Sequence, residues 1–218
     1  MPEITAIEPQ KKKKGRFNVF IDGRFAFGAD EATLAKSRLQ IGQKIAESQL
    51  EKLIKETALG KLTDQALRFL SFRPRSEKEV VDYLIKKISQ TANVNYYQAR
   101  QSPQVAKVVD KLKRYNYIND FEFAKWWVGS RTKSKPKGKL LIRLELIKKG
   151  VDKETIQKVF SKYPSEAQLA KVAIAKKMKS YLQLPDSQFK RKIYTYLARR
   201  GFSQDAIRQT LAFLPKNR

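Results

Sequence analysis

The sequence predicts a mainly α-helical protein, built as three tandem three-helix repeats in an elongated array after a small N-terminal β-hairpin and helix extension. Apolar residues recur at helical spacing from residue 61 to the end of the chain. A pattern of helix, two basic residues, glycine, apolar residue and capping residue occurs at 144–156 and again at 195–207. Such self-similarity is typical of stacked helical repeats. We therefore expect an extension at 1–60 and repeats at 61–118, 119–164 and 165–218.

The extension is expected to hold a β-hairpin. Apolar residues alternate on both sides of Asp22-Gly23, at 17–21 and at 25–27, and Asp-Gly favours a type I′ turn. A short strand is expected around Ile4 and Ile7. Asp30 can cap a helix that reaches about Arg38, and Ser48 can cap a second one. Lys11 to Lys14 form a basic loop that either touches phosphate or is simply solvated.

Helix signals continue through the repeats. We expect a helix at 62–72, and a capping box at Ser76–Glu79 that opens the next one. Residues 89–101 are polar and are expected to be irregular. Further helices are expected from Pro103, at 119–133, at 139–149 and from Asp152, with Gly150 in the left-handed region at a helix end.

The helix at 139–149 carries two apolar stripes. Leu140, Leu144 and Ile147 form one stripe, and Ile142 and Leu146 form the other. Two stripes predict that this helix packs between two neighbouring elements.

Charge is the strongest compositional signal. The 218 residues include 47 Lys and Arg against 21 Asp and Glu, a formal net charge of +26. Residues 119–218 hold twenty-four of the basic residues and eight of the acidic ones. Such an excess predicts an anionic partner, which we expect to be single- or double-stranded DNA bound by electrostatic attraction.

Several classes of function are excluded or disfavoured. The chain has no Cys and no His, which removes disulfides, thiolate nucleophiles, imidazole bases and the usual zinc sites. We expect no catalytic residue, no metal and no cofactor. No apolar run is long enough to span a membrane, and there is no signal-peptide pattern, so a cytoplasmic protein is expected. We also expect it to be a monomer.

The candidate nucleic-acid contacts are basic residues. Six lie within thirteen positions around one helix connector, which exceeds what helix capping needs: Arg131, Lys133, Lys135, Lys137, Lys139 and Arg143. Two pairs precede the repeated glycine, and for these the favourable interaction with a helix C-terminus is an equally good explanation: Lys148, Lys149, Arg199 and Arg200. Arg73 and Arg75 are weaker candidates, for which plain solvation is the better interpretation.

The aromatic residues of 119–133 lie close to this charge. Trp126 and Trp127 point about 100° apart on a helix, so both cannot face one core. We expect one of them in the core and the other at a repeat junction or the surface, where Trp127 is a weak candidate for base stacking. Tyr196 and Phe202 are expected in the core.

The ordered set "RFNVFIDGRFAFG", "ALRFLSFRPRSEKEVVDYL", "YINDFEFAKWWVGSR" and "LARRGFSQDAIRQTL" resembles the RecX family. The resemblance covers essentially the whole chain. It implies a regulator of the RecA recombinase that binds the RecA filament on single-stranded DNA and modulates, mostly inhibiting, its ATPase, strand exchange and growth. A place in DNA repair, recombination and the SOS response follows from the same resemblance.

Two further functions stay open beside the RecA-filament regulator. A general DNA- or RNA-binding helical array would share the charge and act without RecA. A nuclease would need clustered carboxylates for a divalent cation, and the nearest pairs, Asp120/Glu122 and Asp152/Glu154, sit where helix capping explains them. No GxxxxGK[ST] phosphate-binding loop is present.

Overall fold

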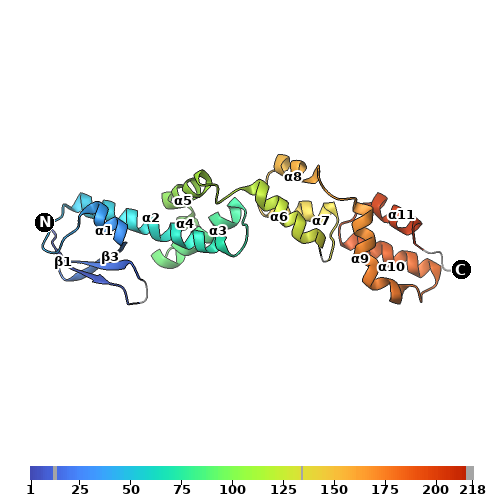
Figure 1. The fold of residues 1–218 in the computed structure, drawn as a ribbon, viewed down its shortest axis with the longest axis horizontal. Coiled ribbons are helices and arrows are strands. Elements are labelled where there is room, and N and C mark those ends of the chain that lie inside the picture. The colour runs from blue at the N-terminus through green and yellow to red at the C-terminus, as the bar shows by residue number, and fades with distance from the viewer. Residues whose placement is uncertain (12–13, 134, 215–218) are drawn as a thin grey trace. The chain divides into compact units, whose positions relative to one another are not determined.

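The computed structural model describes residues 1–11, 14–133 and 135–214. Within them, eleven helices follow a three-stranded antiparallel sheet, in a mainly helical architecture (Figure 1). The chain folds into two compact units, Met1–Phe69 with Leu84–Asp110, and Leu70–Tyr83 with Lys111–Arg218. Of the expected basic loop, Lys12 and Lys13 lie outside the described residues.

The N-terminal sheet has the order β1 (Ile4–Pro9), β2 (Arg16–Ile21) and β3 (Arg24–Asp30). Asp22 and Gly23 have φ of 48° and 74°, and Ile21 pairs directly with Arg24. Positive φ at both central residues is the type I′ geometry that the Asp-Gly pair predicts. The two-residue turn therefore fixes the strand register.

One face of the sheet is buried. Val19 and Ile4 are fully buried, and with six further residues they form one hydrophobic core cluster of the first unit. The remaining members are Ile21, Phe27, Ala29, Leu39, Ile45 and Leu53. Asp30 caps α1 (Glu31–Ser37) by accepting the Thr33 N–H at 2.7 Å, which confirms the expected cap.

The segment after the sheet differs from expectation. In place of two helices there is one continuous helix, α2 (Glu47–Ser71), so the boundary we drew at residue 60 lies inside it. Gly60 lies inside this helix, and one glycine in a helix interior costs only about 1 kcal/mol, which is too little to end it. The polar stretch 89–101 is also ordered: α3 (Glu77–Ala92) continues into it, and α4 (Tyr96–Arg100) has its own capping box.

The remaining helices group in threes. After α5 (Pro103–Arg114), the second repeat consists of α6 (Asp120–Lys133), α7 (Lys139–Lys148) and α8 (Lys153–Phe160). The third repeat consists of α9 (Glu166–Tyr181), α10 (Asp186–Arg199) and α11 (Gln204–Ala212), which pack on one another (Figure 1). The sequence period and the structural period therefore agree.

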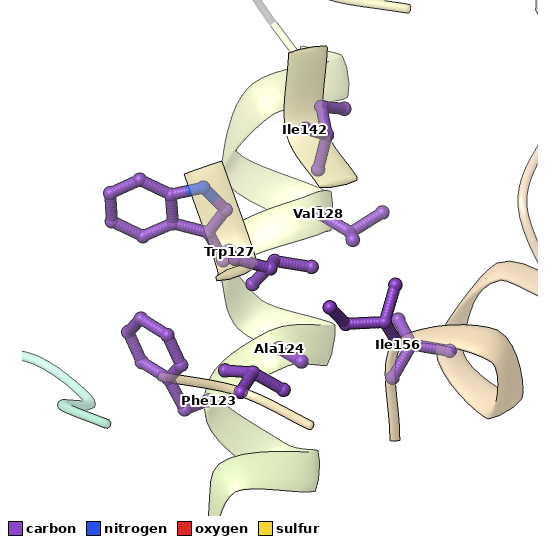
Figure 2. Close-up of a cluster of buried hydrophobic side chains, with 9 residues drawn as sticks. Phe123, Ala124, Trp127, Val128, Ile142 and Ile156 are labelled. Carbon is purple, nitrogen blue, oxygen red and sulfur yellow. The ribbon is translucent and has the colours of Figure 1, made fainter. Parts of the chain in front are cut away.

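The hydrophobic core of the second repeat is centred on α6. Phe123 and Trp127 lie next to each other on one flank of the helix, with ring centroids 5.6 Å apart. Val128 lies on the flank that faces Ile156 of α8, and Ile142 comes from α7 (Figure 2). Trp126 is only half-buried. One tryptophan in the core and one at its edge is the arrangement that the sequence predicted.

The expectation for α7 was wrong in one respect. Ile142 and Leu146 are fully buried, but the second stripe is exposed, with Leu140 at 61%, and Leu144 and Ile147 each at 47%. α7 does pack between two neighbouring helices, α6 and α8, but it meets them through the side that carries Ile142 and Leu146. The second apolar stripe therefore remains on the surface.

Candidate nucleic-acid and protein interface

Consecutive repeats are joined by one recurring contact. Asp120, the first residue of α6, accepts the backbone N–H of Glu77, the first residue of α3, at 2.8 Å. Glu166, the first residue of α9, accepts the N–H of Lys139, the first residue of α7, also at 2.8 Å. Each carboxylate satisfies an N–H that has no partner within its own helix. The first helix of one repeat thus caps the second helix of the repeat before it.

A glycine turn completes each junction. Gly150 and Gly201 have φ of 82° and 78° and end α7 and α10 in the left-handed conformation. A Cβ at Gly150 would lie 2.7 Å from the Cβ of Lys78, and one at Gly201 would lie 2.5 Å from the Cβ of Leu141. Glycine is required at both positions for two reasons: the positive φ, and the close approach of a residue from the preceding repeat.

At the junction between the first and second repeats, Glu79 binds two of the candidate cations, Arg73 and Lys149. Its carboxylate accepts hydrogen bonds from both terminal nitrogens of Arg73, at 2.9 and 3.1 Å, and from Lys149 Nζ. Burial alone would raise the pKa of Glu79, but these two cations outweigh burial and lower it to about 2. The Glu79 carboxylate also accepts the Ser76 N–H at 3.4 Å, and Ser76 Oγ accepts the Glu79 N–H. The expected capping box is therefore present.

Glu145 forms hydrogen bonds with two cations of the connector, Arg131 and Lys137. It accepts hydrogen bonds from Trp127 Nε1 and Arg131 Nε, each at 2.8 Å, and from Lys137 Nζ. Burial would raise the pKa of this carboxyl, and the hydrogen bonds from Lys137, Arg131 and Trp127 lower it. Arg131 and Lys137 therefore serve first to fix the connector against α7.

The Trp127 ring is enclosed by positive charge. The Arg131 guanidinium lies 4.1 Å from a ring centroid, Lys149 Nζ lies 5.4 Å away, and Arg73 lies 6.0 Å away. Cations over an indole face are attracted by its quadrupole. Only 8% of Trp127 is exposed. The dense pairing of aromatics and cations in the sequence is thus accounted for by an internal junction, which leaves little of this ring for a nucleic-acid base.

Arg200 plays the matching part at the second junction. Its NH1 atom donates to the carbonyls of Lys135 and Pro136, each at 3.1 Å, and its guanidinium lies 4.9 Å from the Tyr196 ring centroid. Lys149 and Arg200 stand at equivalent positions before the two glycines. The second cation of each pair therefore contacts the preceding repeat, whereas the first, Lys148 or Arg199, is exposed.

The other predicted contacts divide by exposure. The exposed members are Lys133, Lys135, Lys139, Arg143, Lys148 and Arg199, although Lys139 Nζ also lies 5.2 Å from the Tyr163 ring centroid. Lys139 and Arg143 also line a hollow of about 340 Å³ together with Leu140, Phe160, Glu166 and Ser203. The half-buried members are Arg73, Arg75, Arg131, Lys137, Lys149 and Arg200. Phe202 is buried as expected, and Tyr196 is half-buried.

Sequence reasoning missed the contacts that Glu79, Asp120 and Glu166 make to another repeat, and the contacts of Glu145 to the connector. A signal was available for two of them, because Asp120 and Glu166 precede the matching segments 123–125 and 169–171 by the same number of residues. Asp152 was interpreted correctly, since it accepts the Thr155 N–H of its own helix at 2.8 Å. Asp120 was expected to do the same for α6, but Asn119 caps that helix instead.

Comparison with known proteins gives a consistent result. Four family models match the chain: the regulatory protein RecX N-terminal domain at residues 2–46, and the first, second and third three-helix domains of RecX at 64–91, 119–159 and 164–211. The described residues include no helix long and apolar enough to cross a membrane.

Relatives and solved structures agree with these models. The regulatory protein RecX of Listeria monocytogenes serovar 1/2a is 35% identical over 205 residues, covering 93% of this chain and 72% of the relative. That of Bacillus subtilis is 34% identical, covering 95% and 75%. A crystal structure of regulatory protein RecX superposes with a TM-score of 0.68 at 26% identity, over 96% of this chain and 98% of the other. Another, from Lactobacillus salivarius, gives 0.58 at 25% identity, over 72% and 97%. With its sheet, its three helical repeats and these relatives, the chain belongs to the RecX family of regulatory proteins.

Proposed function

We propose that this protein regulates the RecA recombinase by binding the RecA filament on single-stranded DNA and inhibiting its ATP hydrolysis, strand exchange and growth. Membership of a regulatory family supports a role in control, and the net charge of +26 supports a polyanionic element in the target. We assign the chain no reaction of its own. Action on a filament that forms on chromosomal DNA would take place in the cytoplasm.

The outer face of α7 is the observation that favours a protein–DNA filament over DNA alone. Leu140, Leu144 and Ile147 are exposed along one side of the helix, since positions i, i+4 and i+7 share a face. Aliphatic side chains form no ion pair or hydrogen bond with phosphate, so this stripe adds nothing to electrostatic binding of DNA alone. Contiguous exposed apolar residues of this kind are typical of a protein-binding surface.

The positive charges around this face of α7 indicate what kind of partner surface could cover it. Arg143 lies within the stripe, and Lys139 and Lys148 stand at the two ends of the helix, all exposed. A partner that covers the leucines therefore needs acidic groups at its rim, since like charges across an interface cost binding energy. The hollow beside Leu140, bordered by Phe160, can receive one apolar side chain of that partner.

General nucleic-acid binding is the second candidate function. Lys133, Lys135 and Arg199 are exposed and lie away from the apolar stripe in the sequence. Neutralising phosphates releases counterions, so affinity for DNA alone would fall steeply with salt. This function would need no RecA and would leave the apolar face of α7 unused.

The two functions separate in a binding experiment with the triple variant Leu140→Ser, Leu144→Ser and Ile147→Ser. We expect its affinity for the RecA filament to fall at least about tenfold, as for loss of an apolar interface centre, and its affinity for naked single-stranded DNA to stay unchanged. Val172→Ser is the matched control, because Val172 is 57% exposed on α9.

Each other outcome removes part of the proposal. Equal loss on filament and naked DNA would mean that the substitutions damage the fold or a shared DNA site. An unchanged filament affinity would remove α7 as the contact. A wild-type protein that binds naked DNA as tightly as the filament would favour general nucleic-acid binding.

A further inference from the structure

The turn between α5 and α6 presents aromatic rings that no core uses. Tyr115 is 69% exposed, Tyr117 is 56% exposed and Phe121 is 39% exposed, all within seven residues. Within the described part of the chain, the Tyr115 and Tyr117 rings stack on no other ring. Singly scattered exposed aromatic residues need no explanation, but several exposed together are typical of a binding site.

The backbone of this turn is held by hydrogen bonds. Asn116 has φ of 57°, the Tyr117 N–H donates to Leu112 O, and the Asn116 N–H donates to Lys113 O, both at 2.9 Å. These two bonds are the Schellman pattern at a helix end. Both tyrosines therefore flank a fixed left-handed residue, and little loop ordering is needed when a ligand binds.

A side-chain bond links the turn to the next helix. Asn119 Nδ2 donates to Asn116 Oδ1 at 3.1 Å, and Asn119 Oδ1 accepts the N–H groups of Phe121 and Glu122. Phe121, at the start of α6, is thus held in a fixed relation to the tyrosine turn. The three rings belong to one local unit.

Positive charge accompanies the rings. Lys111 and Arg114 are exposed in the last turn of α5, and Lys125 Nζ lies 5.5 Å from the Phe121 ring centroid. Lys113 is paired with Glu77 at 2.9 Å and serves the junction instead. Cations at a helix C-terminus can be explained by the helix dipole. That explanation does not cover three exposed aromatic rings beside them.

We propose that Tyr115 and Tyr117 form a stacking platform for the bases of a single-stranded nucleic acid, with Lys111 and Arg114 contacting its phosphates. Aromatic stacking accepts any base, and a neighbouring cation track follows the backbone. Phe121 borders the platform on the α6 side. The inference rests on the proposed function and deepens it, because it supplies a sequence-independent contact to the DNA strand in the filament.

The test is fluorescence anisotropy with a labelled oligothymidylate and no RecA, at several salt concentrations. For Tyr115→Leu with Tyr117→Leu we expect affinity to fall about tenfold or more, given about 1–3 kcal/mol of stacking per base. The plot of log affinity against log salt should shift down with an unchanged slope, because no phosphate contact is lost. Lys111→Gln with Arg114→Gln should reduce the slope instead.

Three controls make the result specific. Tyr115→Phe with Tyr117→Phe should bind as wild type, because a phenyl ring also stacks on bases. Normal binding of this variant would show that loss of the rings, and not substitution at these positions, weakens the leucine variant. Tyr97→Leu removes a tyrosine that is 75% exposed on α4 and should have no effect. An abasic oligonucleotide should bind wild type more weakly than oligothymidylate, but should bind the leucine variant equally.

Unchanged binding of the leucine variant at every salt concentration would overturn the proposal. If that variant also lost its effect on RecA-catalysed ATP hydrolysis, the rings would be a protein contact and not a base platform. Failure of the proposed function would appear separately, as a wild-type protein that leaves RecA unaffected while the stacking measurements hold.

Discussion

The Asp120 carboxylate accepts the backbone N–H of Glu77 at 2.8 Å, although 43 residues separate them. The same bond recurs between Glu166 and Lys139 one repeat later. A carboxylate at the start of one helix thus completes the hydrogen bonding of another helix in the preceding repeat.

Removal of this cap should weaken the junction. For Asp120→Ala we expect a loss of about 1–2 kcal/mol in the free energy of unfolding, because the N–H of Glu77 loses its acceptor. Urea unfolding followed by circular dichroism measures it. Asp205→Ala is the control, since that carboxylate is 76% exposed and only pairs with Arg208, and its loss should stay below about 0.5 kcal/mol. Equal effects of the two substitutions would contradict the role of Asp120.

The glycine turns offer a second test of the junctions. Gly201→Ala should destabilise the protein by about 2–4 kcal/mol, because the new Cβ meets Leu141 Cβ at 2.5 Å and the left-handed φ is strained. Gly42→Ala has the matching φ of 82° but nothing within 4 Å. It should cost only about 1 kcal/mol. Thermal unfolding of both variants separates the clash from the backbone effect, and equal shifts would argue against close packing at Gly201.

Glu79 gives the junction a pH dependence. Its pKa is lowered from 4.5 to about 2 in the folded protein, so its stabilising effect is fully present above pH 4.5 and is lost as the pH falls through about 2. Glu79→Gln should therefore cost about 2 kcal/mol at neutral pH, where Arg73 and Lys149 lose their partner. The cost should shrink progressively below pH 4.5.

Urea unfolding of wild type and Glu79→Gln, from neutral pH down to about pH 2, measures this difference. Glu51→Gln is the control, because Glu51 forms an i,i+4 pair with Lys55 and its side chain is 70% exposed. A constant difference across the whole range for Glu79→Gln would show that its charge does not carry the effect.

The connector cations are best tested by charge reversal of members that the fold does not use. Lys133→Glu, Lys135→Glu and Arg143→Glu alter exposed side chains. We expect weaker binding to the filament and to DNA, a smaller salt slope and unchanged helicity. Lys137 is excluded, because its bond to Glu145 would confuse loss of binding with loss of structure. Unchanged binding at physiological salt would remove the connector from the interface.

Local signals predicted the elements well. The Asp22-Gly23 turn, the Asp30 and Asp152 caps and the Ser76–Glu79 capping box depend on residues within a few positions, and the structure confirms each. Helix ends within long helical stretches were harder. α2 continues through Gly60, and the low helix propensity of one glycine does not decide whether a helix ends there.

The candidate interface was harder to predict for a related reason. Arg131 and Arg143 look alike in the sequence, but Glu145 engages only the former. Whether a cation forms an ion pair within the fold depends on carboxylates of other helices. Glu79, for example, binds Lys149 although 70 residues separate them. Likewise, Leu140 and Ile142 are equally apolar, yet only Ile142 is buried. Such differences arise from tertiary packing and have no local pattern.

The most direct test of the account is RecA-catalysed, single-strand-dependent ATP hydrolysis, with this protein titrated in below the RecA concentration. A regulator that acts on the filament should inhibit at a small fraction of the RecA concentration, and the Leu140, Leu144 and Ile147 serine variant should have lost that inhibition. Inhibition that appears only when the protein is abundant enough to cover the DNA would mean competition for phosphates, and would contradict regulation through the filament.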